Sequence, residues 1–135
     1  DGSVRFWLAA MPVALALGPL AVVAHVAADP RWDLAFGWLA VWGWAGTLVH
    51  GMLTRIVPFL TWYHRFSSKL GKARVPAMRQ FYPDARVRAG FAIHVATTVA
   101  GLAGIATGVA WPAGVGLVAT GGWLGWHLVG VWRPR

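Results

Sequence analysis

Four long apolar runs, divided by two short turns and one cation-rich stretch, constrain this chain more than any other feature of its sequence. The runs cover about residues 4–28, 33–62, 89–110 and 113–132. Each run supplies the roughly 20 residues that a helix needs to cross a bilayer. They are too long for the roughly 10-residue strands of a membrane barrel. Because a helix satisfies its own backbone hydrogen bonds in lipid, we expect an all-α integral membrane four-helix bundle, a single transmembrane domain over residues 1–135.

The composition also indicates a lipid environment. Hydrophobic residues make up 58% of the chain. Charged residues make up only 12%, and 4 of them are acidic, whereas charged residues make up about 25% of a typical soluble domain. The 10 Trp residues suit bilayer interfaces. The chain has no Cys, which excludes disulfides, iron–sulfur clusters and thiolate zinc sites.

The net charge of +8 comes from cations placed between and beyond the apolar runs. One side of the expected bundle, made of the loop at residues 64–88 and the outer ends of the first and fourth runs, holds Arg5, Arg65, Lys69, Lys72, Arg74, Arg79, Arg86, Arg88, Arg133 and Arg135. The other side holds only Arg31, between Asp29 and Asp33. By the positive-inside rule, both termini and the loop are expected to be cytoplasmic, in a bacterial inner membrane. This pattern explains the charge without nucleic acid as a partner, and it suits the loop to anionic lipids.

Three histidines lie on three different apolar runs at nearly the same depth: His50, His94 and His127. Counted from the two short turns, which are expected at the outer membrane surface, each histidine lies roughly 22–25 Å from that surface. Imidazole is a good ligand for iron, copper or zinc, and histidines on antiparallel helices at matched depth suit bis-His ligation of haem. The sequence therefore makes these three residues candidate metal ligands, with haem b held between the second, third and fourth helices.

The same histidines also have a structural interpretation, in which they hydrogen-bond across helices. Arg55 is likewise open to two interpretations: it can extend to the lipid headgroups, or it can serve as a cation for a haem propionate. A proton path through His50, Arg55 and His94 is a third hypothesis, weakened because no buried acid is present to relay protons. Pro58 is expected to kink or end the second helix.

Glycines recur at a spacing of four residues in the third and fourth runs. The pairs are Gly104 with Gly108 and Gly121 with Gly125. Small residues at this spacing let membrane helices approach closely. We therefore expect a tight hairpin of the third and fourth spans, or contact of these glycines with a helix of another protein.

The stretch from His50 to Phe66 (HGMLTRIVPFLTWYHRF), followed by residues 75–78 (VPAM), Tyr82-Pro83 and residues 91–94 (FAIH), carries a family resemblance. It resembles the C-terminal part of bacterial multi-span membrane proteins that are distant relatives of haem–copper oxidase subunit I. The resemblance covers about residues 40–94. It implies a haem-associated, respiratory-chain setting with His50 and His94 as the positions of interest. The chain departs from that family in being far shorter than a twelve-span subunit and in having no two histidines one residue apart.

These features together predict a small polytopic subunit of a larger bioenergetic, electron-transfer complex, in contact with other membrane subunits and holding haem b at His50, His94, His127 and Arg55. The alternative is a purely structural or assembly subunit that binds lipid or pigment and has no redox cofactor. No buried pair of carboxylates and no Ser-His-Asp arrangement is apparent. We therefore expect no catalytic activity from this chain by itself.

Overall fold

The computed structural model describes residues 2–72, 74–77, 80 and 82–132, and within this part of the chain every regular element is helical. The elements are α1 (Val4–Val26), α2 (Arg31–Trp38), the π-helix η1 (Leu39–Gly46), α3 (Thr47–Phe66), the short 3-10 helix η2 (Ser67–Lys69), α4 (Asp84–Thr107) and α5 (Trp111–Trp132). The all-α prediction is confirmed. Because α2, η1 and α3 follow one another directly, they form one long rod.

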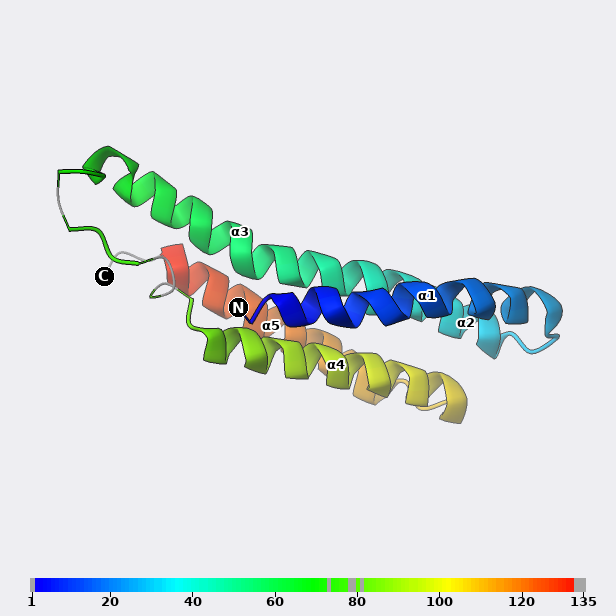
Figure 1. The fold of residues 1–135 in the computed structure, drawn as a ribbon. Coiled ribbons are helices and arrows are strands. Elements are labelled where there is room, and N and C mark those ends of the chain that lie inside the picture. Colours follow the sequence, from blue (N-terminus) through cyan, green and yellow to red (C-terminus); the bar gives the residue numbers. More distant parts are fainter. Residues whose placement is uncertain (1, 73, 78–79, 81, 133–135) are drawn as a thin grey trace.

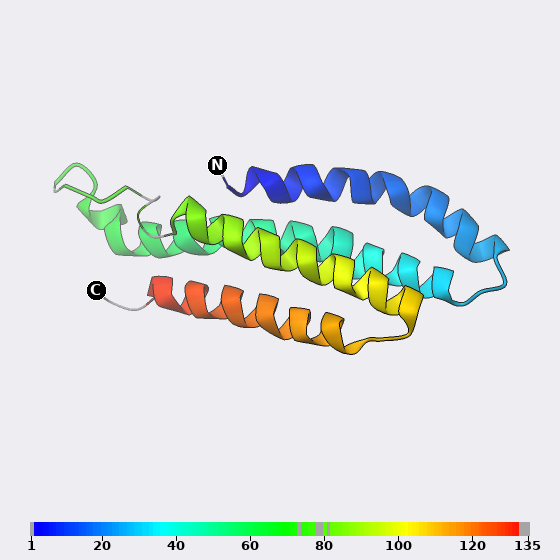
Figure 2. The same ribbon diagram turned by 90° about the horizontal axis from the view of Figure 1, so that it is seen from below.

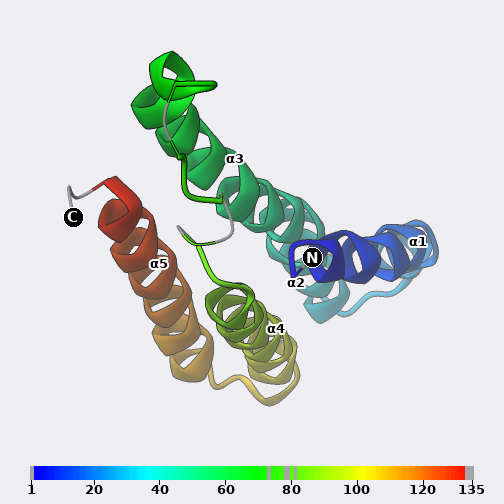
Figure 3. The same cartoon turned by 60° about the vertical axis from the view of Figure 1, so that its left-hand side comes forward.

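The four rods lie side by side, with α1 on one side and α5 on the other side of a central pair formed by α3 and α4 (Figures 2 and 3). Figure 1 shows the start of α1, the end of α3, the start of α4 and the end of α5 at one end of the molecule. The two short turns, from α1 to α2 and from α4 to α5, lie at the opposite end. The cations of the loop therefore share one end of the molecule, as expected, although Arg79, Arg133 and Arg135 lie outside the described residues.

Three of the described helices are long and apolar enough to cross a membrane: α1, α4 and α5. The chain is therefore an integral membrane protein with a helical bundle. The rod of α2, η1 and α3 is interrupted by the π-helix, and it carries Arg31 and Asp33 near its start and Arg55 within α3.

The core of the bundle combines many buried polar side chains with a few apolar ones, the largest of which are Phe6 and Tyr82. Its buried polar side chains are Ser3, Thr47, His50, Thr54, Thr61, His94, Thr97 and Thr120. Large apolar side chains instead face outward, such as Leu15, which is 80% exposed, and Val118, which is 76% exposed. This distribution is the one expected in lipid, where apolar contact between helices gains nothing over contact with lipid tails and small or polar residues hold helices together.

The helix ends differ from the ends of the apolar runs. Helix α4 begins at Asp84, ahead of the apolar run predicted from residue 89, and it ends at Thr107. Gly108 takes a left-handed backbone conformation (φ 78°) and its N–H donates to the Gly104 carbonyl, which is a common way to end a helix. Helix α3 continues through the buried Pro58 to Phe66, so Pro58 does not end the helix.

The glycines that pack the helices are mostly not the ones expected. A Cβ on Gly101 would collide with the Trp38 indole, and a Cβ on Gly116 would collide with Thr97. The Gly104–Gly108 pair instead builds the end of α4, because a Cβ on Gly104 would lie 2.8 Å from the Val109 carbonyl oxygen. Gly121 and Gly125 do not pack against another helix of this chain, since no described atom of a neighbouring helix lies within 4 Å of a Cβ at either position. Contact of these two glycines with a helix of another protein stays a prediction. Helices α4 and α5 do form a close hairpin, but through Thr97, Gly116 and Thr120.

Candidate functional site

The structure brings His50 and His94 into direct contact inside the bundle. His50 lies on α3 and His94 on α4, and their ring centroids are 5.4 Å apart with the planes nearly perpendicular. His50 is 4% exposed and His94 is 1% exposed. Their helices run in opposite directions, so the prediction of matched depth holds for these two residues. We call these two residues the imidazole pair.

A hydroxyl group orients one ring of the pair. Thr47 Oγ1 donates its proton to the carbonyl oxygen of Gly43, and it lies 2.8 Å from His94 Nε2. Because a hydroxyl has a single proton, Thr47 accepts from His94 at this contact. We therefore assign the Nε2–H tautomer to a neutral His94, which leaves Nδ1 as the nitrogen with a lone pair.

Aromatic rings enclose the imidazole pair. Phe6, at the start of α1, is completely buried, and its ring centroid lies 4.7 Å from that of His50. Trp42, within η1, stacks on His94 at 4.8 Å. Gly51 admits Phe6, because a Cβ on Gly51 would lie 2.7 Å from the Phe6 Cβ. The pair is thus sealed from the surroundings of the protein.

Three ring nitrogens in this cluster are buried without a hydrogen-bond partner among the described residues: Trp42 Nε1, His50 Nε2 and His94 Nδ1. His50 Nε2 and the Trp123 indole both lie 3.3 Å from the position of a Cβ on Gly90. The indole N–H itself points to the Arg86 carbonyl at 3.4 Å. A buried polar group without a partner costs about 1–3 kcal/mol. The Trp42 indole can only donate a hydrogen bond, so a metal or a hydrogen-bond donor could be received by the imidazole nitrogens alone.

The structure does not bring His127 to the imidazole pair. His127 packs against Trp123, with a centroid distance of 4.4 Å, and against Tyr82 at 6.2 Å. It therefore lies closer to the loop end of the molecule, with Trp123 between it and the pair. Burial raises the pKa of the Tyr82 phenol above its ordinary value, against the opposing effect of the Arg86 charge.

The remaining candidates also lie apart from the pair. Arg55 is exposed, whereas the inward face of α3 is formed by Thr47, His50, Gly51, Thr54, Pro58 and Thr61. His25 and His64 are exposed near opposite ends of the molecule. Among the described residues, no three His, Cys, Asp or Glu side chains gather closely enough to hold a metal ion.

The geometry of the pair allows a test of haem binding. The Nε2 of His94 is engaged by Thr47, and the Nε2 of His50 faces Gly90. The two nitrogens do not point at a common centre, so a porphyrin clamped between these two rings does not fit this arrangement. The donor chemistry does fit a metal on one side of the pair, because both unpartnered atoms are imidazole nitrogens.

The sequence interpretation missed Thr47, Trp42 and Phe6. Thr47 had a signal in the sequence, because Thr47, Thr54 and Thr61 recur every seven residues within an apolar run, a spacing that keeps them on one face of a helix. Phe6 and Trp42 had none, since aromatic residues in apolar runs are common and only the fold shows which of them turn inward.

The fold and the imidazole pair together define a helical integral membrane protein with a buried polar centre. Comparisons with protein-family models, with curated proteins and with solved structures gave no match for this chain. Its function is therefore argued from the geometry of the centre.

Proposed function

We propose that this chain is a small polytopic subunit of a larger bioenergetic, electron-transfer complex, and that the imidazole pair receives a transition metal or a metal-containing cofactor; haem b fits this proposal only with a single imidazole of the pair as its ligand. The observation that carries the proposal is the presence of two adjacent imidazoles, each with a buried and unpartnered nitrogen. In a bilayer interior such atoms are costly unless a ligand or a partner engages them. His50 Nε2 and His94 Nδ1 are the nitrogens available to the metal.

The cofactor would supply the redox chemistry, and the chain would supply the environment. Phe6 and Trp42 exclude water from the pair. Thr47 fixes the His94 ring through its hydroxyl. The Gly121 and Gly125 face of α5, which the chain itself leaves open, supports contact with a helix of another subunit.

The proposed placement has four spans, with both termini and the loop on the cytoplasmic side of a bacterial inner membrane. The rod of α2, η1 and α3 forms the additional span. The support is the collection of cations at one end of the molecule (Figure 1) and the preference of cationic loops for the cytoplasmic side. This placement puts the loop next to anionic lipids.

A visible spectrum and a metal analysis of the full chain, purified in an uncharged detergent, test the cofactor. We expect a haem absorption or a stoichiometric transition metal. His50→Ala and His94→Ala should each lower the haem or metal content of the purified protein at least about tenfold, because loss of a metal ligand removes well over about 1.4 kcal/mol of binding free energy. His25→Ala, a change of the same type in an exposed histidine of α1, is the matched control and should keep the content unchanged.

A purely structural imidazole pair is the second candidate, and the hydrogen bond from His94 to Thr47 favours it. Under this alternative the protein contains neither haem nor metal, and His50→Ala and His94→Ala lower only its stability. That result would overturn the cofactor proposal and leave an assembly subunit that binds lipid or pigment.

A further inference from the structure

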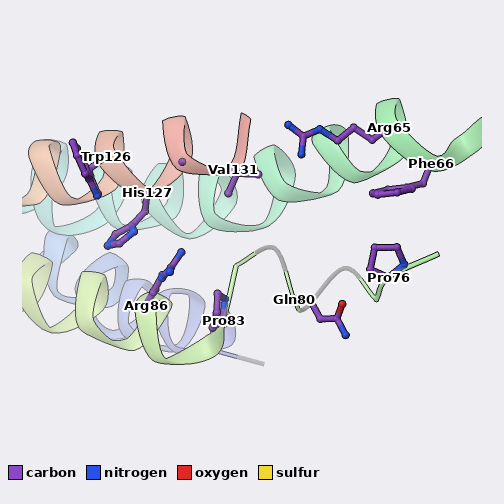
Figure 4. A pocket seen from close by; sticks show the side chains of 10 residues that line it. Arg65, Phe66, Pro76, Gln80, Pro83, Arg86, Trp126, His127 and Val131 are labelled. Atoms are coloured by element: carbon purple, nitrogen blue, oxygen red, sulfur yellow. The ribbon is translucent and has the colours of Figure 1, made fainter. Parts of the chain in front are cut away.

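A separate hollow of about 410 Å³ lies at the loop end of the molecule, away from the imidazole pair. Residues of α3, α4, α5 and the loop line it, among them Arg65, Arg86, Trp126, His127 and Val131. Figure 4 shows that Arg86 extends toward His127 and that the guanidinium groups of Arg65 and Arg86 lie on either side of Val131. Three helices thus contribute cationic or imidazole groups to a single hollow.

The charge of this hollow is positive. None of its described lining residues is acidic. The acid nearest in sequence is Asp84, which does not line the hollow and accepts a hydrogen bond from the Gly2 N–H at 3.3 Å. Arginine forms forked hydrogen bonds that match the oxygens of a phosphate group. Two arginines with an adjacent imidazole therefore suit a phosphate group with a net negative charge.

The walls of the hollow favour a lipid as the source of that phosphate. Phe66 and Val131 add apolar surface to the lining. Trp126, which also lines the hollow, is 72% exposed on the flank of α5. A headgroup held by the arginines could therefore continue into acyl chains along an apolar helix flank, an arrangement that an inorganic anion does not use.

We propose that this hollow binds the phosphate group of one anionic phospholipid, with Arg65 and Arg86 as its main contacts and His127 beside them. The proposal depends on the membrane placement given above. It does not depend on a cofactor at the imidazole pair.

The test is native mass spectrometry of the full chain in an uncharged detergent, with dimyristoyl phosphatidylglycerol as the probe. We expect a complex of one lipid with one chain. Arg86→Gln should weaken it about tenfold, because the change removes a charged hydrogen-bond donor and keeps a polar side chain with the same Cβ and Cγ groups. Arg88→Gln is the matched control: it removes the same charge from the same helix at an exposed position outside the hollow, and it should change the affinity less than about twofold.

Further measurements distinguish a lipid headgroup from free phosphate, and lipid binding at the hollow from cofactor binding at the imidazole pair. Dimyristoyl phosphatidylcholine should bind more weakly than the anionic lipid. Displacement by equimolar inorganic phosphate would assign the site to free phosphate instead of a headgroup. Arg65→Gln repeats the test if Arg86→Gln does not fold, and His50→Ala should leave lipid binding intact even if it removes a metal. Equal weakening by Arg86→Gln and Arg88→Gln, or equal binding of both lipids, would overturn the proposal.

Discussion

At the scale of single residues, Thr47 decides how the buried imidazole of His94 is held. Its hydroxyl donates to the carbonyl oxygen of Gly43 in η1 and accepts from His94 Nε2. Loss of this acceptor leaves a ring N–H unpaired in an interior without water, where the unpaired group costs more than the hydrogen bond contributes.

Thr47→Val, which keeps the shape of the side chain, should therefore lower the free energy of unfolding by about 1–3 kcal/mol. Unfolding of the full chain in mixed micelles, followed by circular dichroism, measures this change. Thr98→Val is the matched control, because among the described residues the Thr98 hydroxyl bonds only to the His94 backbone carbonyl, at 2.9 Å within α4. An equal loss in both variants would contradict the role assigned to Thr47.

At the scale of the helices, the sequence predicted which segments are helical but not which faces meet. The apolar runs located the helices because their length exceeds what a strand uses. The faces depend on contacts between segments distant in sequence, such as Gly101 with Trp38 and Gly116 with Thr97. For the site, the sequence placed His50 and His94 at one depth. It also placed His127 there, because counting residues along α5 takes no account of how Trp123 separates the two positions.

Gly101 is the position where this helix packing is most sensitive. A Cβ there would collide with the Trp38 indole, a rigid ring whose N–H donates to the Thr98 carbonyl at 3.0 Å. Gly101→Ala should push α2 away from α4 and lower the free energy of unfolding by about 1–3 kcal/mol. Thermal unfolding in detergent measures the effect. Gly125→Ala, made in a helix where the added methyl meets open space, should change stability by less than about 0.5 kcal/mol.

The π-helix η1 sets the rotation of α3 relative to α2. A π turn contains more residues than an α turn and shifts the faces of the helix on its two sides. Deletion of Val41, which is 72% exposed, should convert part of η1 to α-helix and rotate one side relative to the other by up to about 100°. The Trp38–Gly101 and Thr47–His94 contacts then cannot both persist, and the free energy of unfolding should fall by about 2–4 kcal/mol.

Unfolding in mixed micelles measures the effect of this deletion. Deletion of the exposed Leu70, which lies between η2 and α4, is the control and should leave stability nearly unchanged. If the Val41 deletion were tolerated as well as the Leu70 deletion, the π-helix would have no part in positioning the imidazole pair.

At the scale of the whole molecule, the arrangement of polarity matches a bilayer. Most of the buried polar side chains are threonines and histidines, many large apolar side chains face outward, and the described cations gather mainly at one end. With four spans in the proposed orientation, the turn after α4 would lie outside and the loop after α3 would lie in the cytoplasm. With three spans, one of the connections has to change sides.

Single cysteines distinguish these topologies, and the chain has no Cys of its own to interfere. We expect a membrane-impermeant maleimide to label Val109→Cys in intact cells, because residue 109 lies in the turn between α4 and α5. Lys72→Cys, in the loop, should react only after the membrane is permeabilised. Leu15→Cys should resist labelling in both conditions although Leu15 is 80% exposed in the isolated chain, because lipid surrounds it and the reaction needs a thiolate in water. Labelling of Lys72→Cys in intact cells would show that the orientation is reversed or that one span is absent. The hollow proposed to bind phosphate would then lie at the outer face.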